Sequence, residues 1–280
     1  MEEKKKIIDQ YLDKNLPSEN QNPTTIHRSI RYSVLNGGKR IRPILTLMSA
    51  ELFGQSYQKV LPAAAGIELI HTFSLIHDDL PSMDNDDYRR GKLSNHKVFG
   101  EATAILTGDA LLVMGLDFIC KNSKIEGITK ESVVRVLQNI LEKLGTNKML
   151  GGQVDDITWH FQKGNPGYIK EIYQKKTSAL ICAAINTGAL LFNADEGKVE
   201  ALESYGKNIG LAFQIIDDLL DLQQDKKVDE KPTYPTIFGI EESQKAAVKY
   251  SERAKKSIAI FGEKAQLFYE LADFIIQRKQ

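Results

Sequence analysis

AILTGDALLVMGLDFI (residues 104–119) and SALICAAINTGALLF (residues 178–192) are apolar nearly all the way round a helix. Helices of this kind belong in the interior of a large bundle, where neighbouring helices cover every face. Elsewhere the apolar residues recur at spacings of three and four rather than two, which predicts helices and no strand. We therefore expect one all-α domain over residues 1–280, with outer helices around these central ones.

Prolines and N-capping residues divide the remaining sequence into helical segments. The predicted helices cover residues 24–36, 41–54, 58–80, 95–120, 130–147, 167–192, 197–223, 241–262 and 264–278.

The amino-acid composition excludes several classes of protein. The 37 Lys+Arg balance the 37 Asp+Glu, which argues against a protein that binds nucleic acid. The two cysteines, Cys120 and Cys182, lie in apolar stretches, so we expect a reducing cytoplasm and no disulfide framework. The N-terminus has no apolar segment of a signal peptide. Residues 178–192 are shorter than the roughly 20 apolar residues of a bilayer span, so we expect no membrane span.

The segment IHDDLPSMDNDDYRRGK (residues 76–92) holds Asp78, Asp79 and Asp84, followed by Arg89 and Arg90. The apolar pattern before it places the aspartate pair near the C-terminal end of a helix. The helix dipole is unfavourable for carboxylates there, so a positive group must compensate. Taken alone, such a string can equally be a solvated acidic helix end.

The segment IGLAFQIIDDLLDL (residues 209–222) sets Asp217, Asp218 and Asp221 into an apolar helical run. Asp217 and Asp221 share one helix face because they are four residues apart. Carboxylates in such a setting repel one another and lose solvation unless a cation lies between them. Clustered oxygen ligands suit Mg²⁺, which commonly bridges to substrate phosphates. Two such clusters imply a polyanionic substrate.

Cations for that substrate are present in GGKRIRP (residues 37–43), which supplies Lys39, Arg40 and Arg42 just before a helix expected to start near Pro43. Its glycines let the backbone approach a ligand closely, and a helix N-terminus adds partial positive charge. Further candidates are Arg89, Arg90, Lys176 with Thr177, and the lysines Lys226, Lys227 and Lys231.

These strings, together with ATAILTGDALL (102–112), GGQVDDI (151–157), YQKKTSALI (173–181) and KPTYPTIFG (231–239), resemble the trans-isoprenyl diphosphate synthases, most closely the bacterial farnesyl diphosphate synthases. The resemblance covers residues from about 30 to 240. It implies an isoprenoid-synthase-type helical bundle around a central cavity, a homodimer, and the two aspartate clusters across that cavity. In this family the allylic C–O bond ionises, the isopentenyl double bond attacks the cation, and a proton is lost.

The resemblance also implies roles for individual residues. It places Mg²⁺, as three ions with substrate bound, at six aspartates: Asp78, Asp79, Asp84, Asp217, Asp218 and Asp221. It assigns isopentenyl diphosphate to Lys39, Arg42, His71 and Arg90. It assigns the allylic diphosphate to Arg89, Lys176, Thr177, Gln214 and Lys231. Of these, Lys176, Gln214, Asp78 and Asp217 are the expected catalytic residues.

Helix geometry predicts where a floor of the prenyl tunnel could lie. Phe73 precedes Asp78 by five residues, about 7.5 Å along a helix, and Ser74 lies on nearly the same face as Asp78. A ring there would form such a floor, and an aromatic residue at this position resembles the farnesyl (C15) synthases. The alternative is that Phe73 is an ordinary core residue. A geranylgeranyl (C20) synthase is the nearest alternative function.

Two further classes stay open: a terpene cyclase, and a non-catalytic regulatory subunit of a prenyl synthase. The cyclase normally has an N-D-x-x-S-x-x-x-E motif, and the subunit tends to lose one aspartate cluster; neither applies here. One departure from the family is the short LQQDKKVDE (222–230), where relatives carry a longer loop with a GK step. Lys226 or Lys227 is a candidate to replace that lysine.

Overall fold

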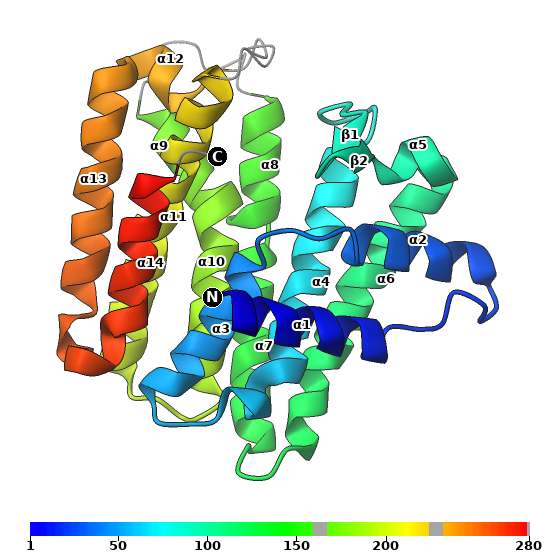
Figure 1. The fold of residues 1–280 in the computed structure, drawn as a ribbon, viewed down its shortest axis with the longest axis horizontal. Helices are drawn as coiled ribbons and strands as arrows, with labels where there is room; N and C mark the ends of the chain where they lie inside the picture. The colour runs from blue at the N-terminus through cyan, green and yellow to red at the C-terminus, as the bar shows by residue number, and fades with distance from the viewer. Residues whose placement is uncertain (159–166, 224–231, 279–280) are drawn as a thin grey trace. The chain divides into compact units, whose positions relative to one another are not determined.

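The computed structural model describes residues 1–158, 167–223 and 232–278, and over these residues the protein is helical (Figure 1). The helices group into two compact units, which are described separately. Unit 1 comprises Met1–Ala50 and Gln55–Leu137, and unit 2 comprises Glu51–Gly54 and Gln138–Gln280. That all 280 residues form one domain stays a prediction.

Unit 1 is built on two long helices. Its elements are α1 (Glu2–Asn15), α2 (Thr24–Val34), α3 (Ile41–Leu52), the 3₁₀ turn η1 (Tyr57–Val60), α4 (Leu61–Asp78), β1 (Tyr88–Arg89), β2 (Lys92–Leu93), α5 (Asn95–Phe99), α6 (Glu101–Cys120), the 3₁₀ turn η2 (Lys121–Lys124) and the start of α7 (Lys130–Leu144). Helices α4 and α6 lie side by side (Figure 1). Glycines allow this approach, because a Cβ at Gly66 would lie 2.5 Å from the Gly115 carbonyl oxygen.

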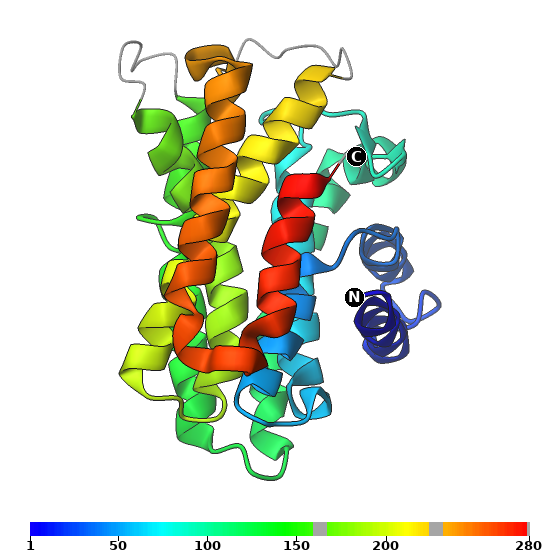
Figure 2. The same cartoon turned by 60° about the vertical axis from the view of Figure 1, so that its left-hand side comes forward.

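Unit 2 surrounds a wholly buried helix. Its elements are the end of α7, α8 (Met149–Ile157), α9 (Tyr168–Tyr173), the π-helical turn η4 (Gln174–Ser178), α10 (Ala179–Leu190), α11 (Glu196–Gln223), α12 (Tyr234–Phe238), α13 (Ile240–Ser257), the 3₁₀ segment η5 (Ala259–Ala265) and α14 (Gln266–Gln277). Every residue of α10 is buried. Helices α13 and α14 pack beside one another and both contact α11 (Figure 2).

The predicted helices agree with these elements, with five differences. The segment 95–120 is broken at Gly100, whose φ of 83° ends α5 and begins α6. Helices α1, α8 and α12 were not predicted. A two-stranded antiparallel hairpin, β1–β2, was not predicted either. The helical class itself is unaffected, because each strand has two residues.

Two expectations drawn from apolarity need correction. The segment 104–119 was expected to be enclosed, but α6 leaves Ile105, Leu106 and Val113 45%, 58% and 67% exposed. The argument against a membrane span was also incomplete. Tyr57–Asp78 and Glu101–Lys124 are long and apolar enough to cross a membrane by length and composition alone, although the first is 72% buried in the protein.

Candidate active site

The first aspartate cluster is folded back on itself at the end of α4. Asp78 is the last residue of that helix, as predicted, and Asp79 caps it. The N–H of Asp84 donates to the carbonyl of Asp78 at 2.9 Å, and the carbonyl of Leu80 accepts from the N–H groups of Met83 and Asn85. This loop therefore brings Asp84 back next to Asp78, although six positions separate them in sequence.

Arg89 supplies the positive charge that the helix C-terminus requires. Its Nε donates to Asp79 Oδ1 at 2.8 Å, its Nη2 contacts the same oxygen, and Nη2 lies 3.0 Å from Asp86 Oδ2. Burial of Asp79, which is 2% exposed, raises the pKa of its carboxyl, and Arg89 offsets part of this effect. Both described partners of Asp79 are nitrogens of Arg89, so a metal role for Asp79 stays a prediction.

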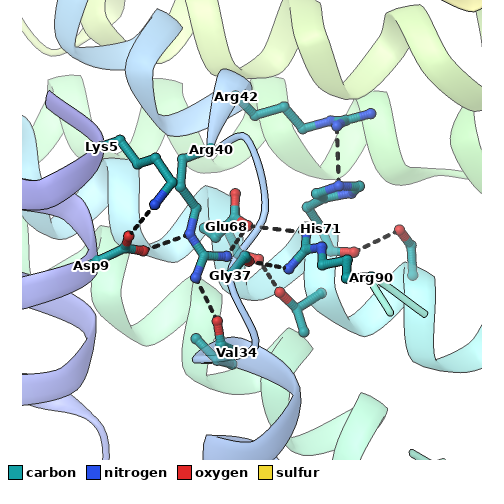
Figure 3. Close-up of polar contacts among 11 residues, drawn as sticks. Lys5, Asp9, Val34, Gly37, Arg40, Arg42, Glu68, His71 and Arg90 are labelled. Atoms are coloured by element: carbon teal, nitrogen blue, oxygen red, sulfur yellow. Dashed lines mark hydrogen bonds and ion pairs between the residues drawn. The ribbon is translucent and has the colours of Figure 1, made fainter. Parts of the chain in front are cut away.

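Arg89 and Arg90 are presented by the β1–β2 hairpin. Arg90 and Gly91 form its turn with φ of 53° and 77°. Arg90 Nη1 donates to the Gly37 carbonyl at 2.6 Å, and Nη2 lies 3.6 Å from Glu68 Oε1 (Figure 3). A Cβ at Gly38 would lie 2.5 Å from the Arg90 Cζ, so the second glycine of GGKRIRP makes room for this side chain.

The three cations of GGKRIRP have different environments, and Figure 3 shows two of them, Arg40 and Arg42. Arg40 is 2% exposed, and its guanidinium donates to Asp9 at 2.8 Å, to Glu68 at 2.6 Å and to the Val34 carbonyl at 2.6 Å. Arg40 therefore holds α1, α2 and α4 together. Lys39 is exposed on the same segment, and the helix that follows begins at Ile41, where the predicted helix 41–54 begins.

Arg42 and His71 form a pair. Arg42 Nη1 donates to His71 Nε2 at 3.1 Å. Burial, followed by the charges of Arg42 and Arg90, holds the pKa of His71 well below its usual range. The ring is therefore neutral at pH 7, and its lone pair orients the Arg42 guanidinium. This arrangement agrees with a role for both residues at one anion site, with His71 positioning the arginine.

Phe73 is buried one and a half turns before Asp78. It is 6% exposed, and the His77 ring meets it edge-on with centroids 5.1 Å apart. His77 itself donates from Nε2 to the Ile105 carbonyl at 3.1 Å, and a Cβ at Gly108 would lie 2.1 Å from that nitrogen. The His77 ring, which α6 holds through the Ile105 carbonyl, therefore packs against Phe73 and limits its movement. The Ser74 hydroxyl donates to the His71 carbonyl at 2.9 Å.

In unit 2 the π-helical turn η4 carries two of the predicted allylic-site residues. π-Helical turns occur often at functional sites because they re-aim side chains. Lys176 Nζ lies 2.8 Å from Asp156 Oδ2, and Lys175 Nζ lies 2.8 Å from Asp155 Oδ2. Helix α8 can lie this close because a Cβ at Gly152 would be 2.6 Å from the backbone nitrogen of Lys176.

A chain of hydrogen bonds joins η4 to the second aspartate cluster. The Thr177 hydroxyl donates to Gln214 Oε1 at 2.8 Å, and Gln214 Nε2 donates to Asp218 Oδ1 at 3.0 Å. The hydroxyl of Tyr173 and the N–H of Tyr234 donate to the other oxygen of Asp218. Burial raises the pKa of Asp218, which is 8% exposed, to about 6 despite these donors.

Asp217 and Asp221 lie on the more open side of α11. Asp217 has a side chain 29% exposed, and its Oδ1 accepts from Arg278 Nη2 at 2.6 Å. Asp221 is exposed. The predicted ligands Lys231, Lys226 and Lys227 lie outside the described residues.

These donors fit Mg²⁺. Asp78 with Asp84, and Asp217 with Asp221, each offer hard oxygen ligands at neighbouring positions, and Asp217 already holds a cation, Arg278. Across the described ranges no three His, Cys, Asp or Glu side chains converge on one point. The fit therefore rests on pairs of carboxylates, and Mg²⁺ bound by one or two carboxylates completes its shell with water and substrate phosphates. Paired carboxylates with arginine and lysine nearby are typical of sites that bind phosphorylated substrates through divalent ions.

Comparison with known proteins identifies this class. Residues 23–264 match the family described as polyprenyl synthetase. The chain is 44% identical over 290 residues to a geranylgeranyl diphosphate synthase of Cyanophora paradoxa, covering 99% of this chain and 94% of that protein. It is 37% identical over 266 residues to a farnesyl diphosphate synthase of Bacillus subtilis (strain 168), covering 91% and 90%.

A crystal structure of an FPP/GFPP synthase from Zymomonas mobilis matches with a TM-score of 0.90 and 32% identity, over 98% of this chain and 96% of that one. The chain belongs to the polyprenyl synthetase family. It is a prenyltransferase with the isoprenoid synthase fold, and its reaction is head-to-tail prenyl transfer. The family uses Mg²⁺, isopentenyl diphosphate and allylic diphosphates. The predicted family, helical fold and enzyme class are confirmed.

Three residues of the described site were missed by the sequence analysis. Asp156 and Tyr173 lie in GGQVDDI and YQKKTSALI, the strings that carry the family resemblance, so membership in those strings was an available signal. Their contacts with Lys176 and Asp218 were not visible in sequence, because the partners lie on different helices. Arg278 lies 61 residues from Asp217 and outside every quoted string.

Proposed function

We propose that the protein is a farnesyl diphosphate synthase, which joins isopentenyl diphosphate to dimethylallyl or geranyl diphosphate and stops at C15. The observation that carries this proposal is Phe73. The ring is buried on α4 about 7.5 Å along the helix axis from Asp78, and His77 braces it. Chain growth past C15 would require this aromatic side chain to move.

The cation sets divide between the two substrates. In unit 1, Lys39, Arg42 and Arg90 bind isopentenyl diphosphate, and His71 orients Arg42 through the 3.1 Å bond between them. Arginine suits bidentate contacts with phosphate oxygens, and lysine suits a single-point contact. Arg89 is anchored by Asp79 and contributes to the allylic diphosphate.

Lys176, Thr177 and Gln214 bind the allylic diphosphate from unit 2, and Lys231 is proposed to join them. Lys176 and Gln214 stabilise the negative charge that develops on the leaving diphosphate. Asp78, Asp84, Asp217 and Asp221 would hold up to three Mg²⁺ ions, with Asp79 and Asp218 beside them; when bound, the ions supply electrophilic stabilisation of that leaving group. No side-chain nucleophile is needed, because the isopentenyl double bond attacks the allylic carbon.

A C20 product is the second candidate, because the Cyanophora relative at 44% identity is a geranylgeranyl diphosphate synthase. The test incubates purified protein with Mg²⁺, isopentenyl diphosphate and geranyl diphosphate, and identifies the products by chain length. We expect C15. C20 as the main product would overturn the proposed length, and a cyclic hydrocarbon or no turnover would favour a cyclase or a regulatory subunit.

Phe73→Ala sharpens the same assay. Removal of the ring opens the floor, and we expect C20 to exceed C15 among the products. Phe261→Ala is the matched control, because it also removes a partly buried ring in an edge-on contact, in this case with Phe53. The control should leave the product length unchanged. Unaltered C15 output from Phe73→Ala would mean that Phe73 is ordinary core.

We also propose that the active protein is a homodimer and that the exposed apolar face of α6, lined by Ile105, Leu106 and Val113, is its interface. Their exposed fractions of 45%, 58% and 67% are unusual for three large apolar side chains on one helix. Sedimentation should give twice the 31.4 kDa chain mass. A monomer at micromolar concentration would exclude this interface. We further propose that the protein acts in the cytoplasm.

A further inference from the structure

Arg278 follows the last residue of α14 and reaches α11 within unit 2. Its Nη2 lies 2.6 Å from Asp217 Oδ1, and its side chain is only 4% exposed. An arginine side chain that is so deeply buried must be anchored by specific contacts, because an unanchored arginine side chain would lie in solvent.

One face of α11 provides these contacts. The Arg278 guanidinium lies over the ring of Phe213, with 4.8 Å between Cζ and the ring centroid. Phe213 and Asp217 are four residues apart on the helix, so ring and carboxylate project from the same face. The ring binds the cation from one side and the carboxylate accepts a hydrogen bond from its edge.

The charge of the second aspartate cluster explains why a cation is held there. Asp217, Asp218 and Asp221 fall within the last two turns of α11, where the helix dipole is also negative. Asp218 is satisfied by uncharged donors, the hydroxyl of Tyr173, the amide of Gln214 and the N–H of Tyr234. Among the contacts described above, Arg278 brings a positive charge to this cluster.

We propose that Arg278 is the resident counter-ion of Asp217 in the metal-free protein and that it exchanges with a divalent ion when the site is loaded. This inference deepens the proposed function and rests on the assignment of Asp217 as a metal ligand. A divalent ion at the Asp217 carboxylate would be repelled by the guanidinium that lies 2.6 Å from Oδ1, so the two cations oppose each other's binding there. By reciprocity, Arg278 weakens metal binding by the factor by which metal binding weakens the Arg278 contact. Metal loading therefore releases the C-terminal segment.

The test measures Mn²⁺ binding to the full chain by electron paramagnetic resonance, without substrate. Arg278→Ala should bind Mn²⁺ about three- to tenfold more tightly than the wild type, the range that a partly exposed charge-assisted pair supports. The Mn²⁺ affinity of Arg278→Lys should lie between those of the wild type and Arg278→Ala. Arg253→Ala is the matched control, because Arg253 also lies over an aromatic ring, that of Tyr250 at 5.8 Å, on α13.

A double substitution separates competition from a general effect on charge. In an Asp217→Ala background, Arg278→Ala should change the Mn²⁺ affinity less than twofold. Equal or weaker Mn²⁺ binding by Arg278→Ala in the native background would overturn the counter-ion role, as would an equal gain in the Asp217→Ala background. If Arg278→Ala lowers the melting temperature strongly, Arg278→Gln repeats the comparison with the packing largely kept.

The outcome is distinguishable from failure of the proposed function. If no prenyl product forms while Arg278→Ala still tightens Mn²⁺ binding, the proposed reaction fails and the counter-ion role stands. If the product forms and the Mn²⁺ affinity is unchanged, the reaction stands and the counter-ion role fails. The hydrogen-exchange rate of backbone amides in residues 266–278 gives a second readout. Addition of Mn²⁺ should increase this rate in the wild type.

Discussion

The two aspartate clusters have the same composition and different supports. Each contains a consecutive pair in which the second member is buried, Asp79 at 2% exposure and Asp218 at 8%. Asp79 is held by a guanidinium, that of Arg89, whereas Asp218 is held by a phenol, an amide and a backbone N–H. One cluster therefore offsets buried charge with charge, and the other offsets it with hydrogen bonds alone.

The backbone differs in a corresponding way. Asp217 and Asp221 reach one face through the helical repeat, which needs no special loop. Asp78 ends its helix, and the chain must fold back through Leu80 before the N–H of Asp84 meets the Asp78 carbonyl at 2.9 Å. Two outer aspartates are thus brought to neighbouring positions once by regular helix and once by a loop. From this comparison we propose that the buried aspartate of each pair supports its cluster and that the outer aspartates hold the metal ions.

The largest effect tests that division. Asp78→Ala and Asp217→Ala should each lower kcat by about 10²–10³-fold, because each removes a proposed ligand of the ions that would stabilise charge on the leaving diphosphate. Steady-state assays with geranyl and isopentenyl diphosphates measure the loss. Asp117→Ala on α6, an exposed aspartate paired with Lys121, is the control and should stay near wild type. A variant of either outer aspartate with wild-type kcat would remove that cluster from the mechanism.

A smaller effect concerns pH. Burial raises the pKa of Asp218 to about 6, from 3.8 in the unfolded chain, so the folded protein binds the extra proton between these values. Its contribution to stability is therefore greatest at low pH and falls by up to about 3 kcal/mol as pH rises from 4 to 7. Urea unfolding in EDTA at several pH values should show this fall in the wild type and its loss in Asp218→Asn.

Asp79→Asn extends the comparison between the clusters. The pKa of Asp79 is also raised, but Arg89 offsets part of the effect of burial. The wild-type stability that depends on Asp79 should therefore fall less steeply with rising pH than the part that depends on Asp218. Asp79→Asn should abolish this smaller fall. A steeper pH dependence from Asp79 than from Asp218 would mean that the guanidinium does not offset the buried charge.

The fold could be predicted from sequence where a helix is apolar on every face or on one regular stripe. The interior helix at 178–192 is an example, since every residue of α10 is buried. The same pattern at 104–119 predicted burial wrongly for Ile105, Leu106 and Val113, because apolarity requires that a face be covered without saying by which chain. Helix α1 was missed because the charges of EEKKK outweigh Ile8 and Leu12, although both are buried.

Helix α8 and the site contacts were missed for a different reason. Two consecutive glycines, Gly151 and Gly152, lower helix propensity, and only the packing against η4 explains why Gly152 is required. The aspartate clusters, Lys176 and Gln214 could be named from motifs, because the chemistry dictates residue types at fixed spacings. Which aspartate is buried and which cation faces it depends on partners from other elements, as for Asp79 with Arg89 on the hairpin.

The smallest effect compares the two supports directly. Arg89→Ala leaves the buried Asp79 carboxylate without its cation, and we expect the free energy of unfolding to fall by about 2 kcal/mol. Tyr173→Phe removes one of three uncharged donors from Asp218, and about 1 kcal/mol is expected because Gln214 and the Tyr234 N–H remain. Urea unfolding at pH 7 in EDTA measures both, with Arg253→Ala as the control. A larger loss from Tyr173→Phe than from Arg89→Ala would reverse the comparison, and the hydrogen-bonded cluster would then be the one in which the buried carboxylate depends more on its partners.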